Sequence, residues 1–171
     1  MRKLVLILIL IPVCFLIYLQ LDPLGYVMPV EGATRSSYSQ QSFWAYPWGT
    51  SGHHKGVDIF AKKGTPVVSA TRGIVVFNGF LSKGGNAVLV FGPWLRQHYY
   101  AHLERSDVHL FEMLSAGDPI GSVGTTGNAK GKPPHLHYSI SRIIPRFGED
   151  LSGNKRFYHD PTPDLNKVAG K

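Results

Sequence analysis

The chain contains 171 residues, which is enough for one domain with a single hydrophobic core. Its one cysteine excludes a disulfide framework and any structural zinc site built from cysteines. Because 18 lysines and arginines exceed 11 acidic residues, the formal net charge is +7, which favours an acidic partner. No aromatic-basic motif of a nucleic-acid-binding module occurs in the sequence, so we expect that this partner is not a nucleic acid.

The N-terminus is predicted to anchor the chain in a membrane. Arg2 and Lys3 precede an apolar run from Leu4 to Leu19 that carries no charge. The run is long for the apolar part of a cleaved signal peptide, and no small-x-small cleavage site follows it. We therefore expect residues 1–21 to form an uncleaved signal anchor, with the basic residues in the cytoplasm and the rest of the chain exported.

The remaining sequence predicts one mainly β domain. Residues 22–41 mix Gly, Pro, Ser and Gln with little periodicity, which is typical of a short tether. Residues 42–165 alternate short Val/Ile/Tyr-rich runs with Gly and Pro, and no long stretch has helical periodicity. We expect at most one short helical turn, near residues 106–113, and a tail over residues 166–171.

The first segment with chemistry-bearing side chains covers residues 54–59. In an extended strand alternate side chains share a face, so His54, Gly56 and Asp58 are expected on one face. Val57 and Ile59 are then expected on the other face. A helix would also bring His54 and Asp58 together, but Gly56 and its β-branched neighbours favour the strand.

Two further strands repeat this alternation. Over residues 98–103 it groups His98, Tyr100 and His102 on a polar face, opposite Tyr99, Ala101 and Leu103. Over residues 135–141 it groups His135, His137, Ser139 and Ser141, opposite Leu136, Tyr138 and Ile140. Three strands with an apolar face and a polar, histidine-bearing face predict a sheet that carries a metal-binding groove.

The residue types suit zinc. Two imidazoles and one carboxylate make a three-ligand zinc site with an open fourth position, and two imidazoles remain for proton transfer. From chemistry alone, either His135 or His137 could reach the metal. His98 shares the polar face but belongs to no motif, and His53, His109 and His159 are expected in loops.

Taken together, the motifs resemble those of the lysostaphin-type (LytM-like) zinc metallopeptidases, which cut peptide cross-links of bacterial cell walls. They are His-x-Gly-x-Asp at residues 54–58, Tyr-x-His-Leu at 100–103 and His-Leu-His at 135–137, and the similarity extends over residues 43–165. The resemblance implies an antiparallel β-sheet groove domain of the duplicated kind. It further implies one zinc ion per chain, held by His54, Asp58 and His137, with His102 and His135 as the catalytic pair.

The same resemblance implies peptidoglycan peptides as substrate and a place at the bacterial inner, or cytoplasmic, membrane, with the domain periplasmic or extracellular. We favour the D-alanyl to diaminopimelate link over a glycine bridge, because a short tether from an inner membrane suits a thin periplasmic wall. The family often has a tyrosine shortly before the first zinc histidine, for which Tyr46 is a candidate. Gly-rich segments at residues 82–86 and 124–132 are expected to form the groove walls.

Two other functions are compatible with parts of the pattern. Residues 63–69 echo residues 116–122, which indicates two related turn-plus-strand units. Lipoyl-like domains of membrane-anchored adaptor proteins have similar units, but they need no inward-facing histidines. Some family relatives have lost zinc ligands and act as non-catalytic activators of wall hydrolases; the complete ligand set of this chain speaks against that role.

Overall fold

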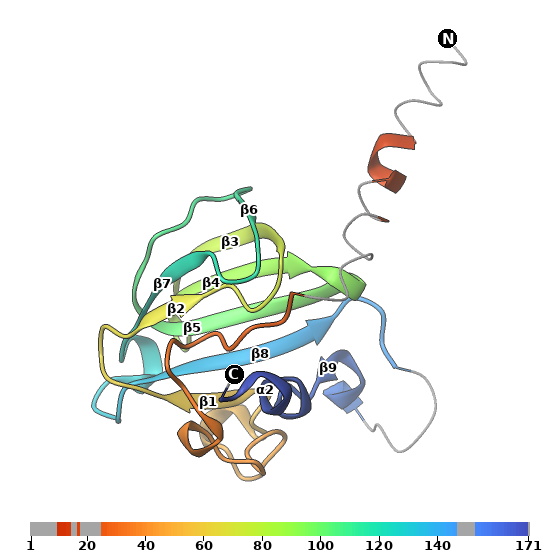
Figure 1. The fold of residues 1–171 in the computed structure, drawn as a ribbon. Coiled ribbons are helices and arrows are strands. Elements are labelled where there is room, and N and C mark those ends of the chain that lie inside the picture. Colours follow the sequence, from red (N-terminus) through yellow and green to blue (C-terminus); the bar gives the residue numbers. More distant parts are fainter. Residues whose placement is uncertain (1–9, 15–16, 18–24, 147–152, 171) are drawn as a thin grey trace.

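One antiparallel sheet organises the computed structural model, which describes residues 10–14, 17, 25–146 and 153–170 (Figure 1). Its nine strands follow the order β1-β8-β5-β4-β3-β6, while β7 pairs with β2 and β5, and β9 pairs with β8. The strands are β1 (Val57–Phe60), β2 (Pro66–Val68), β3 (Gly73–Leu81), β4 (Gly85–Gly92), β5 (Arg96–Ser106), β6 (Met113–Leu114), β7 (Pro119–Val123), β8 (His135–Arg142) and β9 (Tyr158–His159). The predicted antiparallel β class is confirmed.

Helical structure in the described domain is short. The 3-10 turns are η1 (Arg35–Ser37), η2 (Gly49–Ser51), η3 (Pro93–Leu95), η4 (Gly127–Ala129) and η5 (Gly153–Phe157), and the one α-helix is α2 (Thr162–Val168). The helical turn predicted near residues 106–113 is wrong, because that segment passes through a single hydrogen-bonded turn at Leu110 and Phe111 into β6. His159, expected in a loop, lies in β9.

The core lies on one face of β1, β5 and β8. Val57 and Ile59 of β1, and Leu136, Tyr138 and Ile140 of β8, are all fully buried in a single apolar cluster. Burying each such side chain stabilises the fold by roughly 1.5–3 kcal/mol. The period-2 alternation predicted for these two strands is therefore confirmed, and it fixes which face carries the polar side chains.

The two repeated sequence units pair with each other. Val67 of β2 lies opposite Gly121 of β7, so the echo in the sequence corresponds to two strands of one antiparallel ladder. Gly64 and Gly117 occupy equivalent turns with φ of 88° and 91°, a conformation that favours glycine. Their N–H groups donate to Val123 and Ser69 carbonyls, respectively. The duplicated character implied by the resemblance is thus visible in the sheet.

The domain extends beyond its predicted limits. From residue 25 the supposed tether packs onto the sheet: Val30 is fully buried and forms a bridge with Val67. The boundary expected at residue 165 falls inside α2, where Asn166 accepts a hydrogen bond from the Tyr38 hydroxyl at 2.9 Å. Weak periodicity in residues 25–41 reflects an irregular segment that is buried through a few anchor residues.

The expected signal anchor, residues 1–21, lies mostly outside the described residues, which include only 10–14 and 17 of this span. Within the part of the chain that the structure describes, no helix has the length and apolar character needed to cross a membrane.

Candidate metal centre

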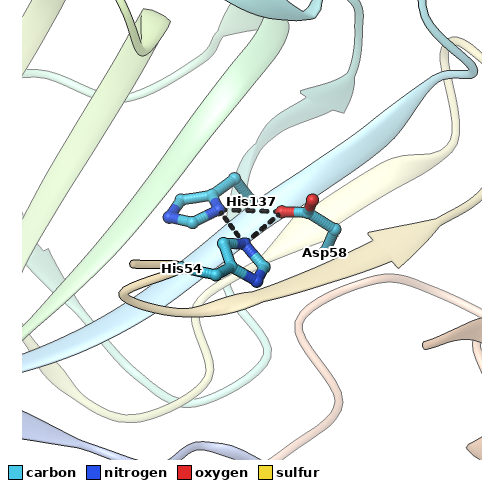
Figure 2. Close-up of side chains that lie close together, drawn as sticks. All are labelled: His54, Asp58 and His137. Atoms are coloured by element: carbon cyan, nitrogen blue, oxygen red, sulfur yellow. Dashed lines mark hydrogen bonds and ion pairs between the residues drawn. The ribbon is translucent and has the colours of Figure 1, made fainter. Parts of the chain in front are cut away.

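Three side chains converge on the polar face of β1 and β8 (Figure 2). His54 precedes β1, Asp58 lies within it, and His137 lies directly opposite Asp58 in the ladder. Asp58 Oδ1 is 3.0 Å from His54 Nε2 and 2.8 Å from His137 Nδ1, and the two nitrogens are 3.1 Å apart. The ladder thus places a carboxylate and two imidazoles around one point.

The tautomer of His54 is fixed by the backbone. Its Nδ1–H donates to the Ser42 carbonyl oxygen at 2.9 Å, which leaves the Nε2 lone pair facing Asp58 and His137. The ring is 1% exposed, so it is held in this orientation by burial as well. A hydrogen bond to one imidazole nitrogen that directs the other at a shared point is the usual arrangement of a metal-binding histidine.

The arrangement fits a small tetrahedral cation. Donors bonded to zinc at about 2.0–2.1 Å with tetrahedral angles lie about 3.3 Å from one another, close to the separations found here. Among the described residues, these three side chains form a cluster of possible metal ligands. One ligand atom from each of His54, Asp58 and His137 lies within 4.8 Å of the other two.

Asp58 is ionised in this setting. Burial acts to raise the pKa of its carboxyl group, but the adjacent His137 and His54 imidazoles outweigh burial and lower that pKa well below its ordinary value. The carboxylate is 14% exposed. A largely buried carboxylate beside two imidazole nitrogens favours occupation by a cation.

His102 reaches the same face through a bulge in β5. Between Leu103, paired with Asn86, and Tyr100, paired with Val88, strand β5 has one extra residue. His102 has φ of 64°, which is uncommon for a residue other than glycine and is typical of a bulge that redirects a side chain. Its ring centroid lies 5.0 Å from that of His135 and 6.0 Å from that of His137.

Backbone carbonyls orient both remaining histidines. His102 Nδ1–H donates to the Thr126 carbonyl at 3.0 Å, and His135 Nδ1–H donates to the Pro133 carbonyl at 2.8 Å. Each ring keeps Nε2 as its proton-accepting nitrogen, and His135 Nε2 lies 3.9 Å from Asp58 Oδ2. Burial, followed by the neighbouring His137 and His135, lowers the pKa of His102 to about 4, so its ring is neutral near pH 7.

The two Gly-rich segments lie against each other beside His102. Lys83 of the β3–β4 turn accepts a hydrogen bond from Asn128 N–H at 2.9 Å, and Gly84 accepts one from His102 N–H at 2.7 Å. Thr126 Oγ1 in turn accepts a hydrogen bond from Asn86 N–H at 2.9 Å. These contacts fix the Thr126 carbonyl that holds the His102 ring.

The face predicted for β5 is wrong for its first residues. Tyr100 lies in the core, where its hydroxyl accepts a hydrogen bond from Ala70 N–H at 2.8 Å. His98 lies beside it, with Nδ1 2.6 Å from the Tyr138 hydroxyl, and is not a site residue. Tyr99 instead shares the polar face, with its ring 6.3 Å from that of His137. The bulge at His102 reverses the alternation of inward and outward side chains along β5, and no pattern in the sequence predicts this bulge.

The aromatic segment before His54 contributes a residue that the motifs missed. Trp48 stacks on His54, with ring centroids 4.0 Å apart and planes inclined by 16°. Tyr46, the candidate from the resemblance, is 72% exposed and contacts the ring of His53. His53 and His109 lie outside strands, as expected. The only feature of the sequence that could have indicated this contact is the position of Trp48, six residues before the candidate ligand His54.

Comparison with known proteins assigns this geometry to a family. The sequence model of Peptidase family M23 matches residues 52–151. An L-Ala--D-Glu endopeptidase of Bacillus subtilis (strain 168) is 34% identical over 140 residues, which cover 77% of this chain and 40% of the relative. A glycyl-glycine endopeptidase of Staphylococcus capitis is 36% identical over 128 residues, which cover 73% and 32% of the two chains.

Among solved structures, the catalytic domain of the antimicrobial peptidase lysostaphin from Staphylococcus simulans matches with a TM-score of 0.59 at 28% identity. The match covers 83% of this chain and 89% of that domain. By contrast, the aligned region spans 40% and 32% of the lengths of the two relatives above. This chain therefore spans less than half the length of either relative.

Proposed function

This chain belongs to peptidase family M23, and from that premise we propose that it is a zinc endopeptidase that hydrolyses peptide cross-links of bacterial peptidoglycan. The observation that carries the proposal is the convergence of His54 Nε2, Asp58 Oδ1 and His137 Nδ1 within 3.1 Å, with two further oriented histidines alongside. In this proposal those three atoms hold one zinc ion per chain. His102 and His135 are the catalytic pair.

The split between ligands and catalytic residues follows strand register. His137 lies opposite Asp58 in the β1–β8 ladder, whereas His135 lies opposite Phe60. His137 Nδ1 is accordingly 2.8 Å from the Asp58 carboxylate, and His135 Nε2 is 3.9 Å from it. The closer histidine suits direct coordination, while the more distant one leaves room for substrate between itself and the centre.

When bound, zinc supplies a Lewis acid that polarises the scissile carbonyl and lowers the pKa of water to about 7. His102 and His135 have their Nδ1 atoms engaged by Thr126 and Pro133 carbonyls, so proton transfer takes place at Nε2. One of the two rings accepts the proton of the attacking water and passes it to the leaving amine. The other stabilises negative charge on the carbonyl oxygen.

Support for the substrate class comes from the relatives, which are an L-Ala--D-Glu endopeptidase, a glycyl-glycine endopeptidase and, from Vibrio cholerae, a peptidoglycan DD-endopeptidase. We propose the D-alanyl to diaminopimelate link as the bond cut here, on the argument from a short tether and a thin wall. The activator and adaptor alternatives are less well supported, because the ligand set and both additional histidines are complete and oriented.

We further propose that residues 1–21 hold the chain in the cytoplasmic membrane of a bacterium, with residues 25–170 on the periplasmic or extracellular side. The support is the uncharged run from Leu4 to Leu19 after Arg2 and Lys3. Tethering would raise the local concentration of the enzyme at the nearby wall.

A digestion experiment tests the proposed activity. Purified protein, with its metal content measured, is incubated with peptidoglycan from Gram-negative and Gram-positive species, and the products are identified by mass spectrometry. We expect intact glycan chains with cleaved cross-peptides, lost on chelation and restored by zinc. Cut glycan with untouched peptides would overturn the proposal, and zinc binding with no cleavage of any wall would favour the activator.

A further inference from the structure

An apolar tip lies at the end of the sheet where β4, β5 and β8 meet. Trp94 of the β4–β5 hairpin is 61% exposed, and Ile143 and Ile144, just after β8, are 54% and 57% exposed. Ile143 N–H donates to the Leu95 carbonyl at 3.3 Å, so the two segments are joined. Three large apolar side chains therefore point into solvent at adjacent positions.

The hairpin is built in an unusual way. Trp94 and Leu95 have φ of 62° and 53°, and Arg96 N–H donates to the Pro93 carbonyl. Hairpin turns with two such residues normally use Asn-Gly, because other residues are strained in this conformation. A tryptophan here neither suits the turn nor fills the core, which is typical of a residue that contacts something outside the molecule.

Arginines surround the apolar side chains. Arg96 and Arg142 are direct cross-strand partners, and Arg146 N–H donates to the Arg156 carbonyl at 3.0 Å. Burial, followed by the charges of Arg96 and Arg146, lowers the pKa of Arg142. The one nearby carboxylate in the described residues, that of Asp164, is shared by three cationic or basic side chains: His159 at 2.9 Å, Lys167 at 3.1 Å and Arg96 at 3.9 Å. The described tip therefore carries excess positive charge.

The N-terminal segment enters the fold toward this end. Tyr26 donates a hydrogen bond to the Tyr138 hydroxyl at 3.3 Å. The positive charge of Arg96, at the tip, acts to lower the pKa of Tyr26. Six residues separate Leu19, the end of the apolar run, from Tyr26, and the seven steps between these two can span at most about 25 Å. A membrane that held the run would therefore lie close to the tip.

Continuing the proposal of a membrane anchor, we propose that the tip, formed by Trp94, Ile143, Ile144, Arg142, Arg146 and Arg156, docks on the surface of an anionic lipid bilayer. Tryptophan and isoleucine suit the boundary between headgroups and acyl chains, and arginines suit anionic phosphates. Three apolar side chains are few for a stable protein interface, which takes roughly 20–30 residues on each side.

Docking would set the height of the active site. Four residues of β8 lie between His137 and Arg142, so the two are five steps, or about 17 Å, apart along the strand. Figure 1 shows β8 lying between β1 and β5 in the sheet. With the tip on the lipid, the metal centre would be set back from Arg142 by about 17 Å along β8, on the side of the adjacent wall.

Fluorescence quenching tests the docking. The full chain is placed in vesicles of phosphatidylcholine, with or without phosphatidylglycerol, whose acyl chains carry bromine as a quencher of tryptophan emission. Subtracting the signal of Trp94→Phe isolates Trp94 from Trp44 and Trp48. We expect Trp94 quenching that is stronger with phosphatidylglycerol and weaker at high salt.

Charge reversal supplies the matched control. Arg146→Glu should lower the docking equilibrium at least about fivefold in phosphatidylglycerol vesicles, the usual effect of one basic residue at an anionic surface. Lys62→Glu reverses an exposed charge after β1, at the opposite end of the sheet, and should leave Trp94 quenching unchanged. Equal effects of the two variants would overturn the proposal.

Other readouts separate the proposals. Vesicle association without Trp94 quenching would overturn docking and leave the anchor, while loss of association would contradict both. Absence of muropeptide cleavage with normal quenching would contradict only the enzymatic proposal. In cells, a photocrosslinker introduced as Trp94→p-benzoylphenylalanine should react with lipid; capture chiefly of a protein would replace the lipid surface with a protein partner.

Discussion

The indole of Trp48 lies nearly parallel to the imidazole of His54, with centroids 4.0 Å apart and an angle of 16° between the planes. The hydrogen bond from His54 Nδ1–H to the Ser42 carbonyl fixes the same ring from its edge. Stacking and hydrogen bonding together leave the imidazole little freedom to rotate. Trp48 is 40% exposed, so this contact also forms part of the outer wall of the centre.

Trp48→Ala is expected to weaken zinc binding about tenfold, the lower end of the range for residues that orient a metal ligand. Trp48→Phe keeps an aromatic face against His54 and should retain most of the affinity. Competition with a chromophoric chelator measures both. Equal affinities for Trp48→Ala and the wild type would mean that Ser42 and burial alone fix the ring.

Removing a proposed ligand should abolish stoichiometric zinc binding. His54→Ala and His137→Ala each leave two protein donors, which is one fewer than a catalytic zinc site normally has. Elemental analysis after purification should give one zinc ion per wild-type chain and far less for each variant. His109→Ala, in an exposed loop, is the control. Undiminished zinc in His54→Ala would refute the assignment.

The catalytic pair should separate activity from metal content. His102→Ala and His135→Ala remove Nε2 groups that lie beside the centre without belonging to the converging set. Each is expected to keep the zinc and to lose activity by about 10²-fold or more. Cross-linked muropeptide hydrolysis, with metal content measured on the same samples, checks both. A variant that lost zinc and activity together would instead be a ligand.

How far sequence alone predicts this site depends on the regularity of each strand. Alternation places Asp58 and His137 correctly because β1 and β8 run without interruption through the core. In β5 the same argument fails for His98 and Tyr100, since the bulge at His102 inverts the faces. A bulge depends on pairing with β4 and has no signature in the strand's own residues.

The hydrogen-bond acceptors that orient the histidine rings could not be predicted from the sequence either. The carbonyls of Ser42, Thr126 and Pro133 fix the three ring orientations, and a backbone carbonyl is present at every residue, so sequence cannot single these out. Similarly, the choice between His135 and His137 as ligand depends on which one faces Asp58 across the ladder. Register is a property of the folded sheet.

The buried histidine outside the site makes stability depend on pH. Burial, followed by the charge of Arg96, lowers the pKa of His98 from 6.5 to about 3. The unfolded chain therefore binds a proton at a pH where the folded chain does not, and stability is lost as the pH falls from about 6.5 toward 3. Between pH 7 and pH 5 this single residue should cost about 2 kcal/mol.

Urea unfolding at pH 7 and pH 5 measures this loss. His98→Gln keeps an acceptor for the Tyr138 hydroxyl but does not titrate, so its stability should fall less over the same interval. The difference between the two proteins isolates His98 from the other histidines. The same pH dependence in both would show that His98 is not a source of acid sensitivity.

The contact between the two Gly-rich segments predicts a selective effect on activity. Gly127 has φ of 65°, and an added Cβ would collide with backbone atoms of Gly85 and Lys83. Gly131 has φ of 80° but open space around it, so it controls for the backbone conformation alone. Gly131→Ala should cost about 1 kcal/mol of stability, as expected for alanine in this region, with near-normal activity.

Gly127→Ala should cost more, because the β3–β4 turn and η4 must separate. Their separation moves the Thr126 carbonyl, which orients His102, so turnover of cross-linked muropeptides is expected to fall about tenfold or more while zinc content stays near one per chain. Thermal unfolding, metal analysis and kinetics on both variants provide the comparison. Equal loss of turnover in Gly127→Ala and Gly131→Ala would show that the contact between the two segments does not position His102.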